Sequence, residues 1–348
     1  MMKKKSPFTT SNVVLSLIAI ALIIIPFVSD SRTMLILLTQ IFIFGILAMS
    51  YDLLLGFTGI VSFGHAMFFG LGAYSTAIIL NMYENTMLIF IASIVVGMVL
   101  SAFLSFFVGL LTLRLKSHYY AMLTLAISGL ILVVVEKWRT VTKGNDGFTF
   151  RAPDIFRDRM MFYLFVLACL IITFIICKRF VSAPLGRVLI AVRENEQRTA
   201  SLGYKTLHYK VIASVLAGII ASISGSLYAV SLRFVNTSVM SMDITLDALL
   251  MTIIGGVGTL VGPLIGATVI EFAQHYLSGL ARDYPIFERW IIIFGIIYIL
   301  AVIFFPRGIV GTFMQKYGEW KMKRTVNMLT PPSSNIHSFA EDERGEVK

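Results

Sequence analysis

The sequence predicts an all-α integral membrane protein, a polytopic helical bundle with about eight full spans and one hairpin of half-length helices broken at glycine. Of its 348 residues, 57% are hydrophobic and only 14% are charged, and the mean hydropathy is +0.85. A soluble globular protein of this composition would expose far too much apolar surface. Several runs also have, or approach, the length of about 20 apolar residues that one membrane-spanning helix requires.

The predicted spans are runs with almost no charge, at residues 13–28, 34–55, 61–80, 87–113, 119–135, 160–177, 210–232 and 290–305. The first run follows MMKKK, as the apolar region of a signal peptide would. No small-x-small cleavage site comes after it, and the run meets Pro26 instead, so an uncleaved membrane helix is expected.

The distribution of positive charge predicts which side of the membrane each segment faces. If the N-terminal lysines are cytoplasmic and successive spans alternate, most of the 29 lysines and arginines fall on the cytoplasmic side. The charged segment at residues 178–209 is then cytoplasmic too. The expected organisation is a cytoplasmic N-terminus at 1–12, a transmembrane domain at 13–312, and a polar, disordered cytoplasmic tail at 313–348.

Two regions of the chain are interrupted by glycines. For the alternation of spans to close, the apolar block at residues 244–277 must enter and leave the membrane on the outer side. Its midpoint reads GGVGTLVGPLIG, residues 255–266, which predicts two short helices meeting at a break. LLLGFTGIVSFGHAMFFGLGAY, residues 53–74, is a comparable region in the first half. One interruption in each half predicts an inverted repeat, and such segments are typical of a transporter's substrate path.

Motifs for nucleotide or metal binding are missing from the sequence. The chain contains no Gly-Lys-Ser or Gly-Lys-Thr triplet to end a Walker A loop, and a dinucleotide fingerprint from Gly256 would need glycine where Val261 stands. Glu271 and His275 are four residues apart, but two ligands alone do not make a metal site. We therefore expect neither an enzyme nor a chain that itself binds a cofactor or metal.

A carrier driven by protons or sodium would usually have acidic side chains well inside its spans. The candidate acids of this chain instead lie near the ends of apolar blocks: Asp52, Asp243, Asp247 and Glu271. Ion coupling is therefore disfavoured, and the energy for any transport is expected to come from elsewhere.

Several stretches together resemble the LivH/LivM family of ABC-importer permeases, and the LivM branch most closely. They are LLLGFTGIVSFGHAMFFGLGAY, TLRLKSHYYAMLTLA, TKGNDGF, APLGRVLIAVRENEQRTASLGY, IIGGVGTLVGPLIGA and PRGIVG. The resemblance covers roughly residues 35 to 311. It implies a multi-pass permease of a bacterial or archaeal plasma membrane, with both termini cytoplasmic, for leucine, isoleucine and valine.

The resemblance also implies partners, which this chain would not contain itself. These are two ATPase subunits that consume the ATP, a second homologous permease subunit, and an extracellular or periplasmic protein that delivers the amino acid. A permease for urea or short amides would show most of the same motifs, so it stays open as an alternative, as does, less favoured, an ion-coupled secondary transporter.

The segment RENEQRTASLG is similar to the short cytoplasmic helix by which importer permeases dock on their ATPases. Its charges would cost roughly 2.5–3.5 kcal/mol each at the centre of a bilayer, so the segment is expected to stay in water. Gly203 suits a helix C-cap. The residues expected to couple to the ATPase are Arg193, Glu194, Asn195, Glu196, Arg198, Ala200 and Gly203.

The substrate path is expected between the two glycine-interrupted regions. The residues predicted to line it are Gly56, Thr58, Ser62, Gly64, Phe68, Gly70, Gly255, Gly256 and Thr259. For each of these residues alone, helix packing is a competing explanation. The outer segments at 136–159 and 233–247 are the expected docking surface for the delivering protein.

Overall fold

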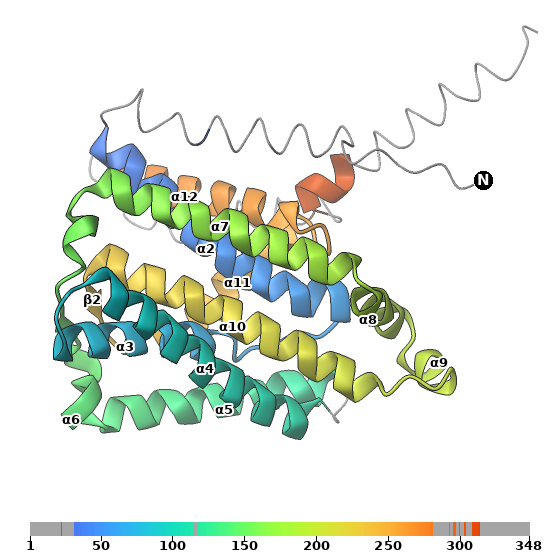
Figure 1. The fold of residues 1–348 in the computed structure, drawn as a ribbon. Helices are drawn as coiled ribbons and strands as arrows, with labels where there is room; N and C mark the ends of the chain where they lie inside the picture. The colour runs from blue at the N-terminus through green and yellow to red at the C-terminus, as the bar shows by residue number, and fades with distance from the viewer. Residues whose placement is uncertain are drawn as a thin grey trace, which may run out of the picture.

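The computed structural model describes residues 22, 31–113, 117–280, 292, 295, 296, 299, 303 and 308–313. The predicted first and last spans, the N-terminus at 1–12 and the tail at 313–348 fall almost wholly outside these residues. The described part is a helical bundle with one two-stranded sheet at its periphery (Figure 1).

Five helices of the described part are long and apolar enough to cross a membrane. They are α2 (Arg32–Thr58), α4 (Met87–Thr112), α5 (Ser117–Lys137), α7 (Arg159–Ser182) and α10 (Thr206–Leu232). Polar residues mark their ends: the Thr86 hydroxyl accepts a hydrogen bond from the Ile89 amide, and the Asp158 carboxylate accepts one from the Met160 amide. Such side-chain caps satisfy amides that the first helical turn leaves free. The chain is thus a multi-pass membrane protein.

The run predicted to span at residues 61–80 forms a shorter helix, α3 (Ala66–Met82), which has 17 residues. The preceding residues 59–65 are not helical. Gly59 caps α2 with φ +73°, a left-handed conformation that favours glycine, and so the chain turns there. The glycine-interrupted region of the first half therefore contains a turn between α2 and a shorter apolar helix, and only residues 66–80 of the run predicted to span are helical.

The apolar block at 244–277 is broken at glycine, as predicted. It forms α11 (Met242–Gly255) and α12 (Val261–Leu280), which pack against each other. The break at residues 256–260 contains three positive φ values, at Gly256, Gly258 and Leu260. Only glycine adopts the first of these, φ +126°, without strain.

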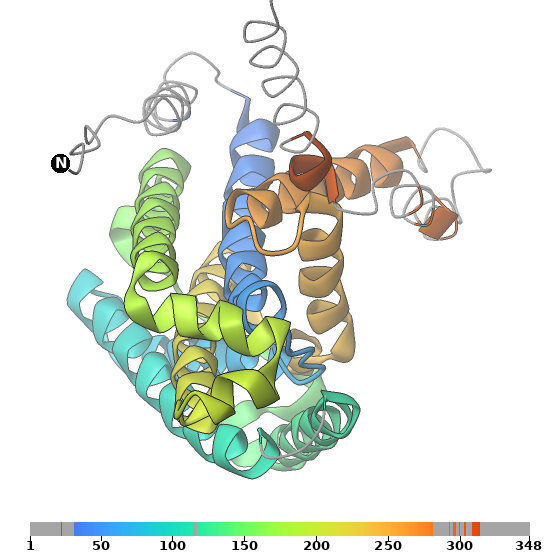
Figure 2. The ribbon, with the colours of Figure 1, turned by 90° about the vertical axis from the view of Figure 1, so that its right-hand side faces the viewer.

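Helix α10 lies at the centre of the bundle, packed against α2, α3 and α4 (Figures 1 and 2). It approaches α3 so closely that their backbones touch. A Cβ atom at Gly72 would collide with the Ser222 carbonyl, and one at Gly225 would collide with the Phe69 carbonyl. Small residues at such crossings let membrane helices pack tightly without a hydrophobic driving force.

Hydroxyl groups on α10 add polar contacts to this packing. Ser224 donates to the Ile43 carbonyl of α2 at 2.6 Å, Ser226 donates to the Gly72 carbonyl of α3 at 3.0 Å, and Ser214 lies 2.9 Å from Ser105 of α4. These interhelical hydrogen bonds satisfy polar groups that lipid could not.

The two ends of the bundle carry different elements (Figure 1). At one end α8 (Pro184–Glu194) and α9 (Glu196–Ser201) lie beyond the ends of α7 and α10; these two helices face the viewer in Figure 2. At the other end lie α6 (Arg139–Thr142), the short 3-10 helices η1 (Gly144–Asp146), η2 (Asp154–Arg157) and η3 (Thr237–Met240), and the strands β1 (Phe148–Thr149) and β2 (Phe234–Val235).

Candidate functional site

Helix α8 is amphipathic. Pro184 occupies its first turn, where the missing amide costs nothing. Leu189 and Val192 are buried against the bundle, while Arg187 and Glu194 are exposed. The helix therefore lies along the end of the bundle on its apolar face and presents charges to the aqueous side.

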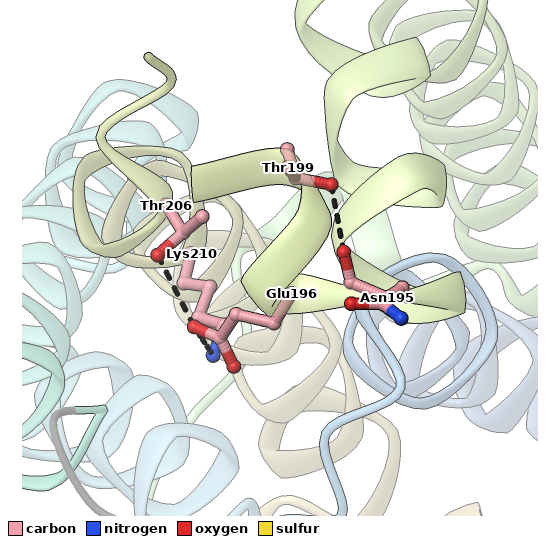
Figure 3. Close-up of polar contacts among 5 residues, drawn as sticks. All are labelled: Asn195, Glu196, Thr199, Thr206 and Lys210. Carbon is pink, nitrogen blue, oxygen red and sulfur yellow. Dashed lines mark hydrogen bonds and ion pairs between the residues drawn. The ribbon is translucent and has the colours of Figure 1, made fainter. Parts of the chain in front are cut away.

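Helix α9 is short and depends on its cap. The Asn195 side chain accepts a hydrogen bond from the Arg198 amide at 2.9 Å, and the buried Thr199 hydroxyl donates to the Asn195 carbonyl at 2.9 Å (Figure 3). Six residues are too few for a helix to persist by itself. Contacts with the bundle must therefore supply its stability.

Glu196 supplies the main polar contact between α9 and the bundle. Its carboxylate accepts hydrogen bonds from the Lys210 ammonium at 2.6 Å and from the Thr206 hydroxyl at 3.1 Å, both on the first turns of α10 (Figure 3). The Lys210 side chain is only 9% exposed, whereas the Glu196 side chain is 48% exposed. The sequence placed Glu196 in this segment but gave no sign of its partners, which follow it by 10 and 14 residues.

Replacing Glu196 by glutamine is expected to destabilise the α9–α10 contact by about 1–3 kcal/mol, between the values for exposed and for buried ion pairs. The loss arises because the Lys210 ammonium stays buried without its counter-charge. The double variant Glu196→Gln/Lys210→Met should recover part of the loss, since no buried charge remains. Thermal unfolding of the purified protein measures both, with exposed Gln197→Ala on the same helix as control. Strictly additive losses would contradict the contact.

The outward surface of this end is formed by the rest of the α8–α9 segment, which we define as residues 184–203. Glu194, Arg198, Ala200 and Gly203 are exposed. Gly203 has φ +89° and open space around it, which fits the predicted C-cap. Leu202, which follows α9, is 74% exposed. This surface therefore carries negative and positive side chains, and the exposed Leu202 forms an apolar tip.

Arg193 behaves differently from its neighbours in this segment. Its guanidinium Nη1 donates to the Gly56 carbonyl, which lies at the end of α2. The charged end of α8 is therefore in contact with the first glycine-interrupted region.

The break between α11 and α12 is held by hydrogen bonds to side chains. The Thr259 hydroxyl donates to the Gly256 carbonyl at 2.8 Å and accepts from the Gly262 amide at 2.9 Å. The Asp52 carboxylate of α2 accepts from the Gly258 amide at 2.7 Å and from the Leu260 amide at 3.3 Å. Asp52 is fully buried. Its role here was missed from sequence; the only signal was an acid near the end of an apolar run.

Most of the predicted path residues are buried, and several of the glycines among them lie in close contact with other elements. Gly255 packs on the Gly262 backbone, Gly64 on the Thr124 backbone, and Gly70 on the Met240 side chain. The others, except Thr259, are also buried: Gly56, Thr58, Ser62, Phe68 and Gly256. The two glycine-interrupted regions meet at Gly56, a predicted path residue, whose backbone touches Gly258, which was not predicted.

A cavity of about 240 Å³ separates part of the α8–α9 segment from the bundle. Its lining includes Gly59, Tyr120, Arg193, Asn195 and Lys210. The segment is therefore held by a few polar contacts here and is not embedded in a close-packed core.

The two segments predicted to form an outer surface lie together at the opposite end. Strands β1 and β2 pair antiparallel, with Phe148 opposite Val235 and Thr149 opposite Phe234. The Thr237 hydroxyl also donates to the Asn145 side chain. Segments about 90 residues apart in the chain thus make one continuous surface.

The chain matches the family model described as "Branched-chain amino acid transport system / permease component" over residues 33–303. It is similar to the high-affinity branched-chain amino acid transport system permease protein LivM of Salmonella typhimurium, with 24% identity over 299 residues, covering 78% of this chain and 68% of the relative. The protein of the same description from Escherichia coli K12 is 25% identical over 300 residues, with the same shares covered.

An archaeal relative is covered over more of its length. This is the probable branched-chain amino acid transport permease protein LivM of Methanocaldococcus jannaschii, 24% identical over 310 residues, which covers 76% of this chain and 89% of the relative. No solved structure matches this chain significantly.

Proposed function

Since this chain belongs to the family of permease components of branched-chain amino acid transport systems, and so is a non-enzymatic permease, we propose that it forms the membrane path of an ATP-driven importer for leucine, isoleucine and valine. Separate ATPase subunits would consume the ATP. The relatives from Salmonella typhimurium and Escherichia coli are described as permease proteins of high-affinity branched-chain amino acid transport systems, which supports this choice of substrate.

One observation carries the proposal. The α8–α9 segment presents an exposed surface of mixed charge with an apolar tip, while Glu196 and Arg193 tie the same segment to α10 and to the end of α2. A partner that moved this segment would therefore act on helices of the bundle. The residues proposed to couple to the ATPase are the predicted set, from Arg193 to Gly203.

The proposed assembly contains two ATPase subunits, a second homologous permease and an extracellular binding protein. The β1–β2 end is the proposed docking surface for the binding protein, because it lies opposite the α8–α9 end (Figure 1). We further propose that the chain has about eight full spans and a half-helix hairpin arranged as an inverted repeat. Both termini would be cytoplasmic, and the membrane would be the plasma membrane of a bacterium or an archaeon. The predicted path residues would line the route between the two glycine-interrupted regions.

Reconstitution tests the proposal. The chain, its partner permease and the two ATPases are placed in liposomes, and uptake of radiolabelled leucine is measured with ATP and with the binding protein. Uptake that requires all components is expected; uptake by the permeases alone, driven by an ion gradient, would indicate a secondary transporter. Competition by urea but not by valine would indicate the short-amide alternative.

Topology gives an independent check. A cysteine replacing Asn195 is expected to react with an impermeant thiol reagent from the cytoplasmic side only. Reaction from the exterior alone would place the α8–α9 segment away from any ATPase and would refute the coupling role.

A further inference from the structure

The side chain of Arg193 lies across the end of α2. Besides the hydrogen bond from its Nη1 to the Gly56 carbonyl, its aliphatic stem covers Gly59, where an added Cβ would lie 3.1 Å from the Arg193 Cγ. Arg193 therefore follows the backbone of the first glycine-interrupted region from Gly56 to Gly59.

Gly56 in turn lies against the second interrupted region. A Cβ at Gly56 would lie 2.7 Å from the Gly258 Cα and would collide with the Asp52 carboxylate. A Cβ at Gly258 would lie 3.1 Å from Nη1 of Arg193 and 3.2 Å from the Gly56 carbonyl oxygen. The Asp52 carboxylate accepts a hydrogen bond from the Gly258 amide.

These contacts form one stack through which α8, α2 and the α11–α12 break touch. Arg193 occupies the aqueous end of the stack, and Asp52 occupies the buried end. Gly56 and Gly258 lie between them, and their backbones can approach each other this closely because neither residue has a side chain.

We propose that Arg193 is a positioning residue that transmits movement of the α8–α9 segment to the glycine break at residues 256–260. This rests on the proposed function, since it assigns to one residue of the coupling segment an inward role in place of a contact with the ATPase. The cavity of about 240 Å³ beside Arg193 leaves room for the segment to shift while the hydrogen bond to Gly56 pulls on the α2 end. When α8 shifts, the backbone geometry of the break at residues 256–260 changes with it, and this linked change is the coupling.

The test compares Arg193→Gln with Arg187→Gln in the full reconstituted complex. Arg187 is an exposed arginine on the same helix and has no part in the stack. Arg193→Gln is expected to keep the ATPase subunits bound and hydrolysing ATP, but to reduce the number of leucine molecules imported per ATP by about tenfold, within the usual range of coupling between sites. Arg187→Gln should leave this ratio unchanged.

Two further variants separate positioning from general damage. Arg193→Lys keeps a donor for the Gly56 carbonyl and should recover part of the ratio. Gly258→Ala places a methyl group 3.1 Å from the guanidinium, on a backbone whose φ of +79° disfavours any side chain, and should lower the ratio too. The double variant Arg193→Gln/Gly258→Ala should lose less than the sum of the two single losses, because the contact between the methyl group and the guanidinium is then absent.

The failures are distinguishable. If the wild-type complex shows no ATP-dependent uptake, the proposed function is refuted. If the wild type couples and Arg193→Gln imports as much leucine per ATP as the wild type, the positioning role is refuted. Loss of bound ATPase subunits in Arg193→Gln would likewise overturn it, by showing that Arg193 is a docking contact.

Discussion

A leucine at Gly225 is expected to prevent the permease from folding into a homogeneous bundle. The added Cβ collides with the Phe69 carbonyl, and that carbonyl belongs to the backbone of α3, which cannot rotate away as a side chain could. Overpacking typically costs about 1–3 kcal/mol, and a contact with backbone is expected at or above the upper end of that range. Because α10 also packs against α2 and α4, separating it from α3 would disturb the centre of the bundle.

Size-exclusion chromatography of the detergent-solubilised protein measures this effect. Gly225→Leu should give aggregated protein or a lower temperature of thermal aggregation. The matched control is Gly129→Leu on α5, where an added Cβ meets nothing within 4 Å. A monodisperse Gly225→Leu protein as stable as Gly129→Leu would show that α3 and α10 are not in contact as described.

A proline at Ala200 is expected to abolish coupled transport without removing the protein from the membrane. Ala200 is exposed in the last turn of α9, so the substitution leaves the core intact. Proline there removes a helical amide donor and clashes with the preceding turn, at a cost of about 3 kcal/mol. That corresponds to roughly a 100-fold loss in the population of the helical segment.

The reconstituted complex distinguishes coupling from assembly. For Ala200→Pro we expect normal amounts of permease in the membrane, ATP hydrolysis that no longer responds to the loaded binding protein, and uptake near background. Ala200→Ser, which keeps both the helix and a small side chain, should transport normally. Wild-type uptake by Ala200→Pro would show that an intact α9 is not required.

The long helices, the glycine break and the amphipathic segment could be predicted from the sequence. The long apolar runs predicted α2, α4, α5, α7 and α10 because a bilayer demands helices of that length and composition. The break after Gly255 was predictable because glycine readily adopts backbone conformations that end a helix. The amphipathic α8–α9 segment was predictable because its charges cannot enter lipid. In each case the physical cause acts over a few residues of the chain.

Other features depend on residues distant in sequence. The start of α3 at Ala66 was not predictable from an apolar run that begins earlier, because the turn is decided by the contacts of residues 59–66 with α5, α8 and α11. The ion pair between Lys210 and Glu196 was likewise not predictable, because it forms only when folding places the two side chains next to each other.

From the sequence alone follow the membrane class, the family resemblance, the position of the polar segment and the location of both glycine-interrupted regions, since hydropathy and glycine content are properties of the local chain. Only the tertiary structure decided that Asp52, Gly56, Gly258 and Arg193 meet in one stack. The reason is physical: a hydrogen bond between residues some 200 positions apart depends on how the helices cross, and that crossing is determined by packing summed over the whole bundle.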